Sequence, residues 1–291
     1  MWAIEQHNTD QIDLIESIDL AVTDLKELSP LNDGDYALCL ETFEENSDQR
    51  LALLDWLEAK IISKMSRRSS SILSVGCGPG TLDEQLLRSA KTRTEHIAYL
   101  GIEPNRIEAA HFLKKMKAQK SDQVDISILI EPFGDQSFDQ SFDLILFVHS
   151  LYYMDDRNKA IDLALNSLTP GGQLVICIAP DEALNAIANL MWQRQMGQES
   201  WFSDDVRNYF EARGLEFRKT QIDAKLNVSD CFDFPTEAGR KIIDFIIQTR
   251  TDKLPNSLRQ MIFEFLISIC ETDGSKTKLS HPVDIFTYKN S

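Results

Sequence analysis

Three short stretches of the sequence carry residue types that could take part in chemistry. VGCGPG at 75–80 places three glycines in six residues. Glu103 follows the apolar run that ends at Ile102. LFVHSLYYMDD at 146–156 is an apolar run that ends on a histidine and is followed by two adjacent tyrosines. Glycine lets a backbone approach a ligand, a carboxylate accepts two hydrogen bonds, and a histidine exchanges protons near neutral pH. Together these residue types suit the binding and reaction of a small ligand.

The glycine turn has the spacing GxGxG, with Gly76, Gly78 and Gly80. A dinucleotide fingerprint, GxGxxG, would need a glycine at Thr81. Pro79 also lacks one of the N–H groups that would hold a pyrophosphate. The turn is similar to the one that holds the amino-acid part of S-adenosylmethionine in class I methyltransferases. The alternative is that the glycines serve the geometry of a tight turn.

Acidic and aromatic residues follow the next apolar runs along the chain. Glu103 stands where a carboxylate can accept hydrogen bonds from both hydroxyls of a ribose, although by itself it could be a solvated loop residue. Glu131 and Phe133 follow the third run and could meet an adenine. Val148 and His149 end the fourth run, and we expect them at the crevice where open α/β sheets bind ligands.

The elements that must position these residues form an alternating pattern. Five short runs are apolar on both faces and are separated by helical segments, which indicates a parallel sheet covered on both sides: 71–75, 96–102, 124–130, 142–149 and 172–179. The segments 216–228 and 283–289 can add an antiparallel C-terminal hairpin. We therefore predict an α/β fold with a doubly wound, mostly parallel, seven-stranded Rossmann-like sheet.

The expected domains follow from the same pattern. Residues 57–229, completed by the final strand 283–289, form the predicted class I methyltransferase core. Residues 1–56 and 230–282 are mainly helical in pattern, and we expect them to form a small region that binds substrate and acts as a lid.

Composition excludes several classes of function. The 291 residues are 43% hydrophobic and 26% charged, which is a globular composition. The net charge of -16 argues against a nucleic-acid partner and against an anionic membrane. The N-terminal stretch is acidic and lacks a basic segment followed by an apolar one, so we expect no secretory signal, and we expect no membrane span because no apolar stretch approaches the required length. Five scattered cysteines fit a reducing compartment and no metal site, so we expect a cytoplasmic protein. The oligomeric state is not set by the sequence, and a monomer is the default expectation.

Longer stretches resemble one family, histamine N-methyltransferase, whose members methylate a small molecule and combine a class I core with a small substrate domain. The resemblance runs from about Tyr36 to the C-terminus. It is carried by ILSVGCGPG, the IEP turn at Glu103, LYY at 151–153, SDDVRNYFEARGLEF and VSDCF at 228–232. It implies S-adenosylmethionine as the cofactor and a small-molecule substrate.

The resemblance also implies a substrate site in which the aromatic residues match and the polar ones have changed. Gln49 stands where the family has a glutamate, His149 where it has a glutamine, and His281 near the position of an asparagine. The aromatic matches are Tyr36, Tyr152, Tyr153 and Trp192. The expected substrate is therefore an amine or an imidazole or other heteroaromatic compound that need not be histamine.

Methyl transfer from a sulfonium is an in-line displacement, so the protein must hold a neutral nucleophile near the methyl group and exclude water. We expect His149 to hydrogen-bond the substrate while Tyr152 and Tyr153 form the wall of the methyl-transfer position. Gln49 and His281 would orient the far end of the substrate. Each residue has a plainer interpretation, as a strand cap, a core side chain or a solvated group.

Other functions remain to be distinguished. The protein could bind S-adenosylmethionine without catalysis, as a regulatory protein, or it could methylate oxygen or carbon. The glycine spacing disfavours a nicotinamide-linked oxidoreductase. HSLYY stands where a nucleic-acid methyltransferase would carry a [DNS]-P-P-[YFW] turn, which disfavours that class.

Overall fold

The computed structural model describes residues 2–25, 28–197, 200–232 and 236–291. The chain divides into two compact units. We call the first the helix unit, which comprises Met1–Gln49, Pro180–Ser200 and Asp223–Pro282. We call the second the sheet unit, which comprises Arg50–Ala179, Trp201–Ile222 and Val283–Ser291.

Three segments fall in a different unit from the domain expected for them. Residues 50–56 belong to the sheet unit, because Leu53 and its helix pack into the core beside the sheet. Residues 180–200 and 223–229 belong to the helix unit, where Met191 and Leu226 are fully buried. Hydrophobic periodicity identifies a helix but does not say which core its apolar face enters.

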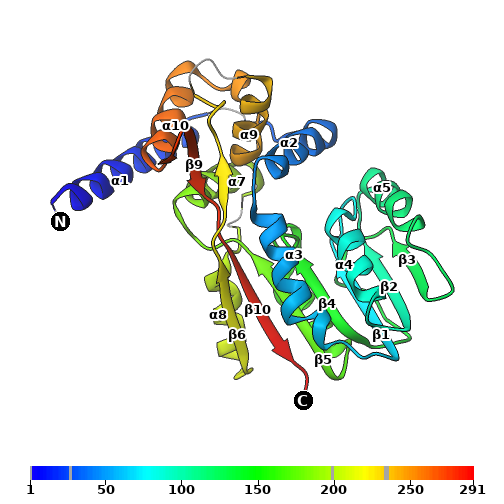
Figure 1. The fold of residues 1–291 in the computed structure, drawn as a ribbon. Helices are drawn as coiled ribbons and strands as arrows, with labels where there is room; N and C mark the ends of the chain where they lie inside the picture. The colour runs from blue at the N-terminus through cyan, green and yellow to red at the C-terminus, as the bar shows by residue number, and fades with distance from the viewer. Residues whose placement is uncertain (1, 26–27, 198–199, 233–235) are drawn as a thin grey trace. The chain divides into compact units, whose positions relative to one another are not determined.

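A seven-stranded sheet forms the centre of the sheet unit (Figure 1), in the order β3-β2-β1-β4-β5-β10-β6. Neighbouring strands from β3 to β5 run parallel, whereas β10 is antiparallel to both β5 and β6. The predicted sheet, including antiparallel pairing at the C-terminal end, is therefore confirmed. The strands are β1 Ser69–Val75, β2 His96–Ile102, β3 Val124–Leu129, β4 Phe142–Val148, β5 Leu168–Ile178, β6 Phe217–Ile222 and β10 Val283–Lys289.

Helices cover both faces of this sheet. Successive residues of a strand point to opposite faces, so neighbouring side chains pack against different helices. Ile72 packs with the helices α3 (Gln49–Lys60), α4 (Thr81–Lys91) and α5 (Arg106–Lys117). Its neighbour Leu73 packs with α6 (Arg157–Asn166) and α8 (Ser203–Ala212). A side chain of this size contributes about 1.5–3 kcal/mol when it is fully buried.

The helix unit contains, among its described residues, five helices and a small antiparallel sheet of order β7-β9-β8 (Figure 1). Its core includes Ile18, Met191, Ile243 and Phe265. The elements are α1 Trp2–Thr23, α2 Asp33–Glu45, α7 Ala183–Met196, β7 Lys225–Asn227, α9 Glu237–Ile247, α10 Asn256–Ser268, β8 Glu271–Asp273 and β9 Lys276–Ser280.

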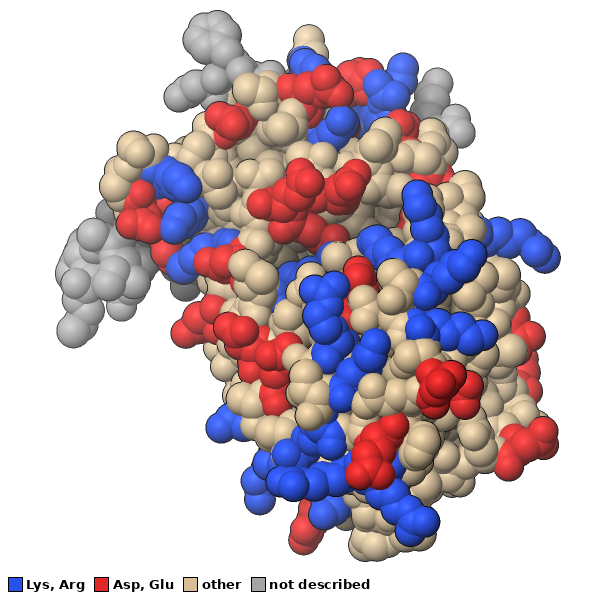
Figure 2. Space-filling model, turned by 45° about the vertical axis from the view of Figure 1, so that its right-hand side comes forward, with Lys and Arg blue, Asp and Glu red and all other residues tan. Residues whose placement is uncertain are grey.

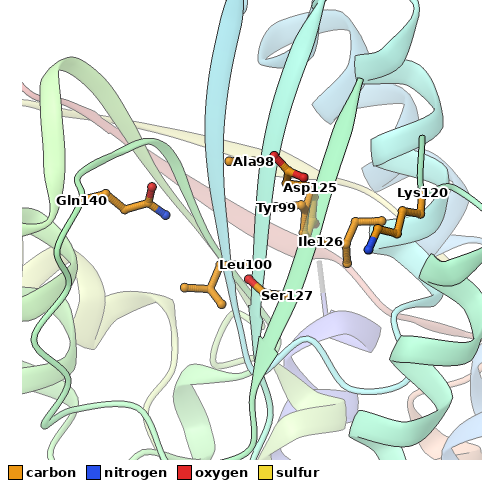
Figure 3. Close-up of a pocket in the computed structure, with 8 residues that line it drawn as sticks. All are labelled: Ala98, Tyr99, Leu100, Lys120, Asp125, Ile126, Ser127 and Gln140. Carbon is orange, nitrogen blue, oxygen red and sulfur yellow. The ribbon is translucent and has the colours of Figure 1, made fainter. Parts of the chain in front are cut away.

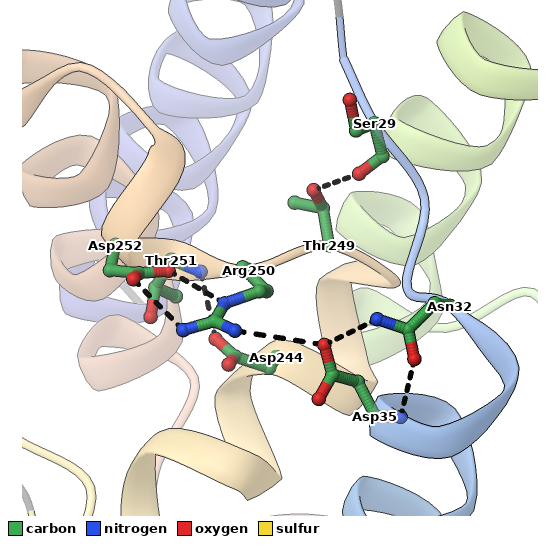
Figure 4. Close-up of polar contacts among 8 residues, drawn as sticks. All are labelled: Ser29, Asn32, Asp35, Asp244, Thr249, Arg250, Thr251 and Asp252. Atoms are coloured by element: carbon green, nitrogen blue, oxygen red, sulfur yellow. Dashed lines mark hydrogen bonds and ion pairs between the residues drawn. The ribbon is translucent and has the colours of Figure 1, made fainter.

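Polar contacts join the start of α2 and the segment before it to the segment after α9 (Figure 4). The guanidinium of Arg250 donates two hydrogen bonds of 3.0 Å to Asp252 and lies 3.7 Å from the carboxylate of Asp35. The hydroxyl of Thr249 donates to the carbonyl of Ser29 at 2.6 Å. The ion pairs are solvent-exposed and add little stability, so the buried threonine bond is the firmer of these ties.

The negative charge of the chain is unevenly distributed. Residues 61–120 carry eleven Lys and Arg against five Asp and Glu, and Figure 2 shows such basic side chains gathered on part of the face in view. The sheet unit therefore has a basic region that the net charge conceals. Within the described ranges, no helix has an apolar run long enough to cross a membrane.

Candidate functional site

The glycine turn lies between the end of β1 and the start of α4. The N–H groups of Gly76 and Cys77 both donate to the carbonyl of Ile102, at 2.8 and 3.2 Å, which ties the turn to the end of β2. Gly76, Gly78 and Gly80 have φ values of +65°, +53° and +72°. Residues with a Cβ atom rarely adopt this left-handed region, so each position favours glycine.

The three glycines serve different purposes. A Cβ atom at Gly76 would lie 2.4 Å from the Cβ of Ser150, and one at Gly80 would lie 2.6 Å from a ring carbon of Phe112. A Cβ atom at Gly78 would meet nothing within 4 Å. Gly76 and Gly80 therefore permit close packing, whereas Gly78 faces open space that a ligand can approach.

Glu103 binds directly to this turn. One of its carboxylate oxygens accepts the N–H of Gly78 at 3.0 Å and the other accepts the N–H of Asn105 at 2.8 Å. Glu103 is 9% exposed, and burial raises its pKa while the two N–H groups lower it. A carboxylate offers about four acceptor positions, so two remain for a pair of ligand hydroxyls.

The end of β4 is joined to the same turn. The hydroxyl of Ser150 donates to the carbonyl of Val75 at 2.6 Å, and the side chain of Ser150 lies against Gly76. His149 has a φ of +51°, an uncommon conformation for a residue with a side chain, and its N–H donates to the carbonyl of Cys177 at 3.0 Å. Strained backbone of this kind tends to occur at functional sites.

His149, Tyr152 and Tyr153 lie together beyond this strand end. The hydroxyl oxygen of Tyr152 is 3.1 Å from Nδ1 of His149 and accepts the N–H of Ala179 at 2.6 Å. The rings of His149 and Tyr152 are nearly parallel, with centroids 6.1 Å apart. Tyr153 is 49% exposed and meets the ring of Tyr152 edge-on. Burial raises the pKa of Tyr152, so its phenol stays neutral at physiological pH.

The residues expected near an adenine lie after β3. Glu131 is exposed and accepts a hydrogen bond of 3.2 Å from the side chain of Gln136. Phe133 is 7% exposed and packs edge-on against Phe147 and face-to-face with Phe138. Its ring is therefore part of the core, and an adenine contact for either residue stays a prediction. Val148, which ends β4, is partly buried against the core.

The helix unit holds the remaining expected substrate residues. Gln49 is 6% exposed, and its amide donates to the carbonyls of His281 and Pro282 at 2.8 and 3.3 Å. The Nδ1 atom of His281 lies 2.8 Å from the hydroxyl of Ser47. Burial lowers the pKa of His281 to about 4, so its imidazole is neutral at physiological pH. The structure thus brings Gln49 and His281 together.

Tyr36 and Trp192 lie on two helices of the same unit. The ring of Tyr36, on α2, is tilted against that of Phe245 on α9 with centroids 5.6 Å apart. Trp192 is half-buried on α7. Their roles toward a substrate stay predictions, as do those of Gln49 and His281.

A comparison with known families decides the class of this protein. The family described as a methyltransferase domain matches residues 33–220, well over half of the chain. The chain belongs to the methyltransferase domain family. The glycine turn, Glu103 and the end of β4 all lie inside the matched range.

This methyltransferase is also similar to individual proteins. Histamine N-methyltransferase of Danio rerio is 18% identical over 260 residues, covering 80% of the chain and 88% of the relative. The O-methyltransferase rstn1 of Aspergillus nomiae is 32% identical over 113 residues, covering 38% of the chain and 47% of the relative. The structure of the plantazolicin methyltransferase BpumL in complex with SAH aligns with a TM-score of 0.51 at 10% identity, covering 100% of both chains.

The methyltransferase also has a buried polar group beneath the glycine turn that sequence reasoning missed. Asp83, in the first turn of α4, accepts a hydrogen bond of 2.7 Å from the hydroxyl of Tyr99. Burial raises the pKa of Asp83, and burial likewise raises the pKa of the Cys77 thiol, so that thiol is unreactive. In the sequence, Asp83 resembles any acidic residue that favours a helix N-terminus.

A pocket of the methyltransferase lies elsewhere. It has a volume of about 290 Å³ and lies over the middle of β2 and β3 (Figure 3), before the strand ends that carry the site. The expected site residues are not among its lining, which consists of Ala98, Tyr99, Leu100, Lys120, Asp125, Ile126, Ser127 and Gln140. We therefore do not assign it to catalysis.

Proposed function

We propose that this methyltransferase transfers a methyl group from S-adenosylmethionine to a nitrogen atom of a small amine or of an imidazole or other heteroaromatic compound. One observation carries the proposal. The carboxylate of Glu103 is held against the N–H of Gly78, beside the open space that faces this glycine. An open glycine position, which lets a ligand approach the backbone, and an acceptor for two hydroxyls thus stand side by side, as a sulfonium nucleoside requires.

The residues present suit each part of that cofactor. The turn at Gly76, Gly78 and Gly80 would hold the amino-acid portion, and Glu103 would accept the ribose hydroxyls. Glu131 and Phe133 mark the end of β3, toward which the adenine would extend, and Val148 would pack beside the cofactor. When bound, S-adenosylmethionine supplies an electrophilic methyl group on a positively charged sulfur.

Other residues would bind and orient the substrate that accepts the methyl group. His149 hydrogen-bonds the substrate, and Tyr152 and Tyr153 wall the transfer position and exclude water. Aromatic faces at Tyr36 and Trp192 suit a π-rich or cationic ligand. His281, clamped by Gln49 through its backbone carbonyl, would orient the far end of the substrate.

The long match to histamine N-methyltransferase, over 80% of the chain, supports nitrogen as the acceptor. The match to an O-methyltransferase is shorter but 32% identical, so transfer to oxygen is the second candidate. A change of acceptor atom would not alter the expected cofactor site, which consists of the glycine turn and Glu103. A protein that binds the cofactor without catalysis would also retain this cofactor site.

Cofactor binding is tested by calorimetric titration with S-adenosylhomocysteine. We expect measurable binding that Glu103→Ala weakens at least tenfold, because the acceptor of the ribose hydroxyls and the partner of Gly78 are both lost. Glu95→Ala, which removes an exposed carboxylate at the start of β2, is the matched control and should bind as the wild type does. No heat at millimolar ligand would refute the proposal.

The acceptor is tested by a methyl-donor consumption screen. Histamine, histidine derivatives, heteroaromatic amines and phenols form the panel, and mass spectrometry locates the added methyl group. Methylation of nitrogen supports the proposal, whereas products methylated only on oxygen favour the second candidate. Cofactor binding without turnover on any compound would favour the non-catalytic function. His149→Ala and His149→Gln then test the contact, and wild-type turnover and affinity in both would remove His149 from the site.

A further inference from the structure

The outward face of α5 combines basic and apolar side chains. The opposite side of this helix is buried through Ala109, Phe112 and Met116. Residues three or four positions apart share one side of a helix, and the outward side exposes Arg106, Ile107, Leu113, Lys114 and Lys117. Ile107 and Leu113 are 57% and 44% exposed. In the described part of the chain, no ion pair joins the basic side chains of this face to an acidic residue. Such a face suits a partner that is both anionic and apolar.

The outward face of α1 has the complementary composition. Ile18 and Val22 on this helix are buried in the core of the helix unit. The opposite side of the helix exposes Ile12, Asp13, Glu16, Asp19 and Leu20. Ile12 and Leu20 are 54% and 69% exposed. This face therefore offers carboxylates and apolar side chains together, which is the combination that the outward face of α5 requires.

The charges of the whole chain are segregated in the same way. Residues 1–49, which contain α1, have thirteen acidic side chains and one basic side chain. Residues 61–120, which contain α5, have eleven basic and five acidic side chains. Two copies that meet through the same face would bring like charges together, which is repulsive, whereas α1 of one copy and α5 of another attract each other. The charge distribution thus favours contact between unlike faces of two copies.

A nucleic acid fits the face of α5 less well. Its phosphates would meet the basic side chains, but they offer no apolar surface to Ile107 and Leu113. Binding of single strands also relies on aromatic rings on which bases stack, and Phe112, the aromatic ring of α5, is fully buried. The exposed apolar side chains therefore favour a protein partner.

We propose that the outward face of α5 is an interaction surface for a second copy of this chain, which docks through the outward face of its own α1. The chain then self-associates, in place of the monomer that is the default expectation. Because the two faces differ, the contact is heterologous, and it adds further copies unless a second identical contact closes the assembly. The association depends on charge, so salt weakens it. It does not depend on the identity of the methyl acceptor.

Sedimentation velocity of the full chain over a range of protein concentrations measures this association. At low salt, about 50 mM, we expect the sedimentation coefficient of the wild type to rise with protein concentration. At about 0.5 M salt the dissociation constant should be at least tenfold higher, because exposed charges are then screened. A protein that stays monomeric at every concentration in low salt, or that associates more tightly in high salt, would refute the proposal.

A charge swap identifies the two faces. One variant combines Lys114→Glu with Lys117→Glu, and the other combines Glu16→Lys with Asp19→Lys. All four side chains are exposed, so both variants should fold, which circular dichroism checks. Each variant alone should have a dissociation constant at least tenfold above that of the wild type, because its α1 and α5 faces then carry the same charge. An equal mixture of the two variants should associate again, since acidic α1 of the first meets basic α5 of the second. Wild-type association in either variant alone, or no association in the mixture, would overturn the assignment of the faces.

A matched control separates this contact from a general effect of net charge. Arg218 and Lys289 are exposed on β6 and β10, at the end of the sheet opposite to β3. The variant that combines Arg218→Glu with Lys289→Glu has the same net charge as the α5 variant, and it should associate as the wild type does. Equal weakening in the two variants would refute a specific contact at α5.

Fluorescence anisotropy with a labelled oligouridylate tests the other occupant of the face. We expect no binding of this RNA that depends on Lys114 and Lys117. If the wild type binds the RNA without associating with itself, and Lys114→Glu with Lys117→Glu abolishes that binding, the proposal is overturned and the face of α5 is a nucleic-acid surface.

Discussion

The glycine turn allows cofactor binding and stability to be separated by substitutions two positions apart. Gly76→Ala combines left-handed strain, about 1–2 kcal/mol, with an overlap in which the new Cβ lies 2.4 Å from the Cβ of Ser150. Overpacking of a buried contact adds about 1–3 kcal/mol. The sum predicts a loss of about 2–5 kcal/mol in the free energy of unfolding.

Gly78→Ala should behave differently. The left-handed strain is similar, but the new Cβ meets nothing within 4 Å, so the expected loss of stability is only about 1–2 kcal/mol. The methyl group occupies the space assigned to the ligand. A steric cost of about 1–3 kcal/mol there corresponds to roughly 5- to 150-fold weaker binding of S-adenosylhomocysteine.

Urea titration gives the stability of each variant and isothermal calorimetry gives its affinity for S-adenosylhomocysteine. We expect Gly78→Ala to be the more stable of the two variants while still binding the ligand more weakly than the wild type. Wild-type affinity in Gly78→Ala would show that the open space is not where the cofactor lies. Equal destabilisation in both variants would refute the distinction drawn between packing and ligand-facing glycines.

Three further substitutions test the polar groups. Glu103→Gln keeps the shape but only one acceptor oxygen, so calorimetry should show roughly 10- to 100-fold weaker binding of S-adenosylhomocysteine; unchanged affinity would exclude a carboxylate contact. Burial raises the pKa of Asp83 above its usual 3.8, so the folded state holds the proton more tightly and wild-type stability falls as the pH rises through that range. Asp83→Asn, in which Tyr99 can still donate to the amide oxygen, should show a smaller fall in unfolding free energy between pH 4 and pH 6 than the wild type does. An identical pH profile in the two proteins would contradict the attribution of this fall to Asp83. Burial lowers the pKa of His281 from 6.5 to about 4, so the unfolded state binds the proton first and stability is lost as the pH falls below 6.5. His281→Asn should therefore avoid a loss of about 2 kcal/mol that urea titration detects in the wild type between pH 7 and pH 5, and an equal loss in both proteins would show that His281 is accessible to protons.

The parts of the site that could be predicted are those fixed by the ends of parallel strands. Such ends meet at one edge of a sheet, so Gly78, Glu103 and His149 could be assigned to that edge from apolar runs and turn residues. The bond between Glu103 and Gly78 agrees with that reasoning. The bounds of β2, His96–Ile102, match the predicted apolar run, because the run is preceded by the charged Glu95 and followed by a turn.

The parts that could not be predicted depend on side-chain direction or on distant partners. Gln49 binds carbonyls more than 230 positions later in the chain, and no local pattern encodes that contact. The ring of Phe133 packs against Phe147 in the core, and an aromatic residue that follows a strand does not by itself signal that direction; its expected adenine contact stays a prediction. The left-handed backbone of His149 has no glycine to signal it.

The place of β10 in the sheet has a consequence for how the chain folds. Val283–Lys289 is the last of the seven strands to be synthesised, yet it lies between β5 and β6, with partners more than 60 and more than 100 residues earlier. Among the strands that the structure describes, β5 has no other partner on that side and β6 has no other partner, so until β10 is made we expect two strand edges to be open to other chains. Completion of the sheet therefore depends on long-range pairing late in synthesis, and we expect slow folding and an incomplete chain that is prone to aggregation.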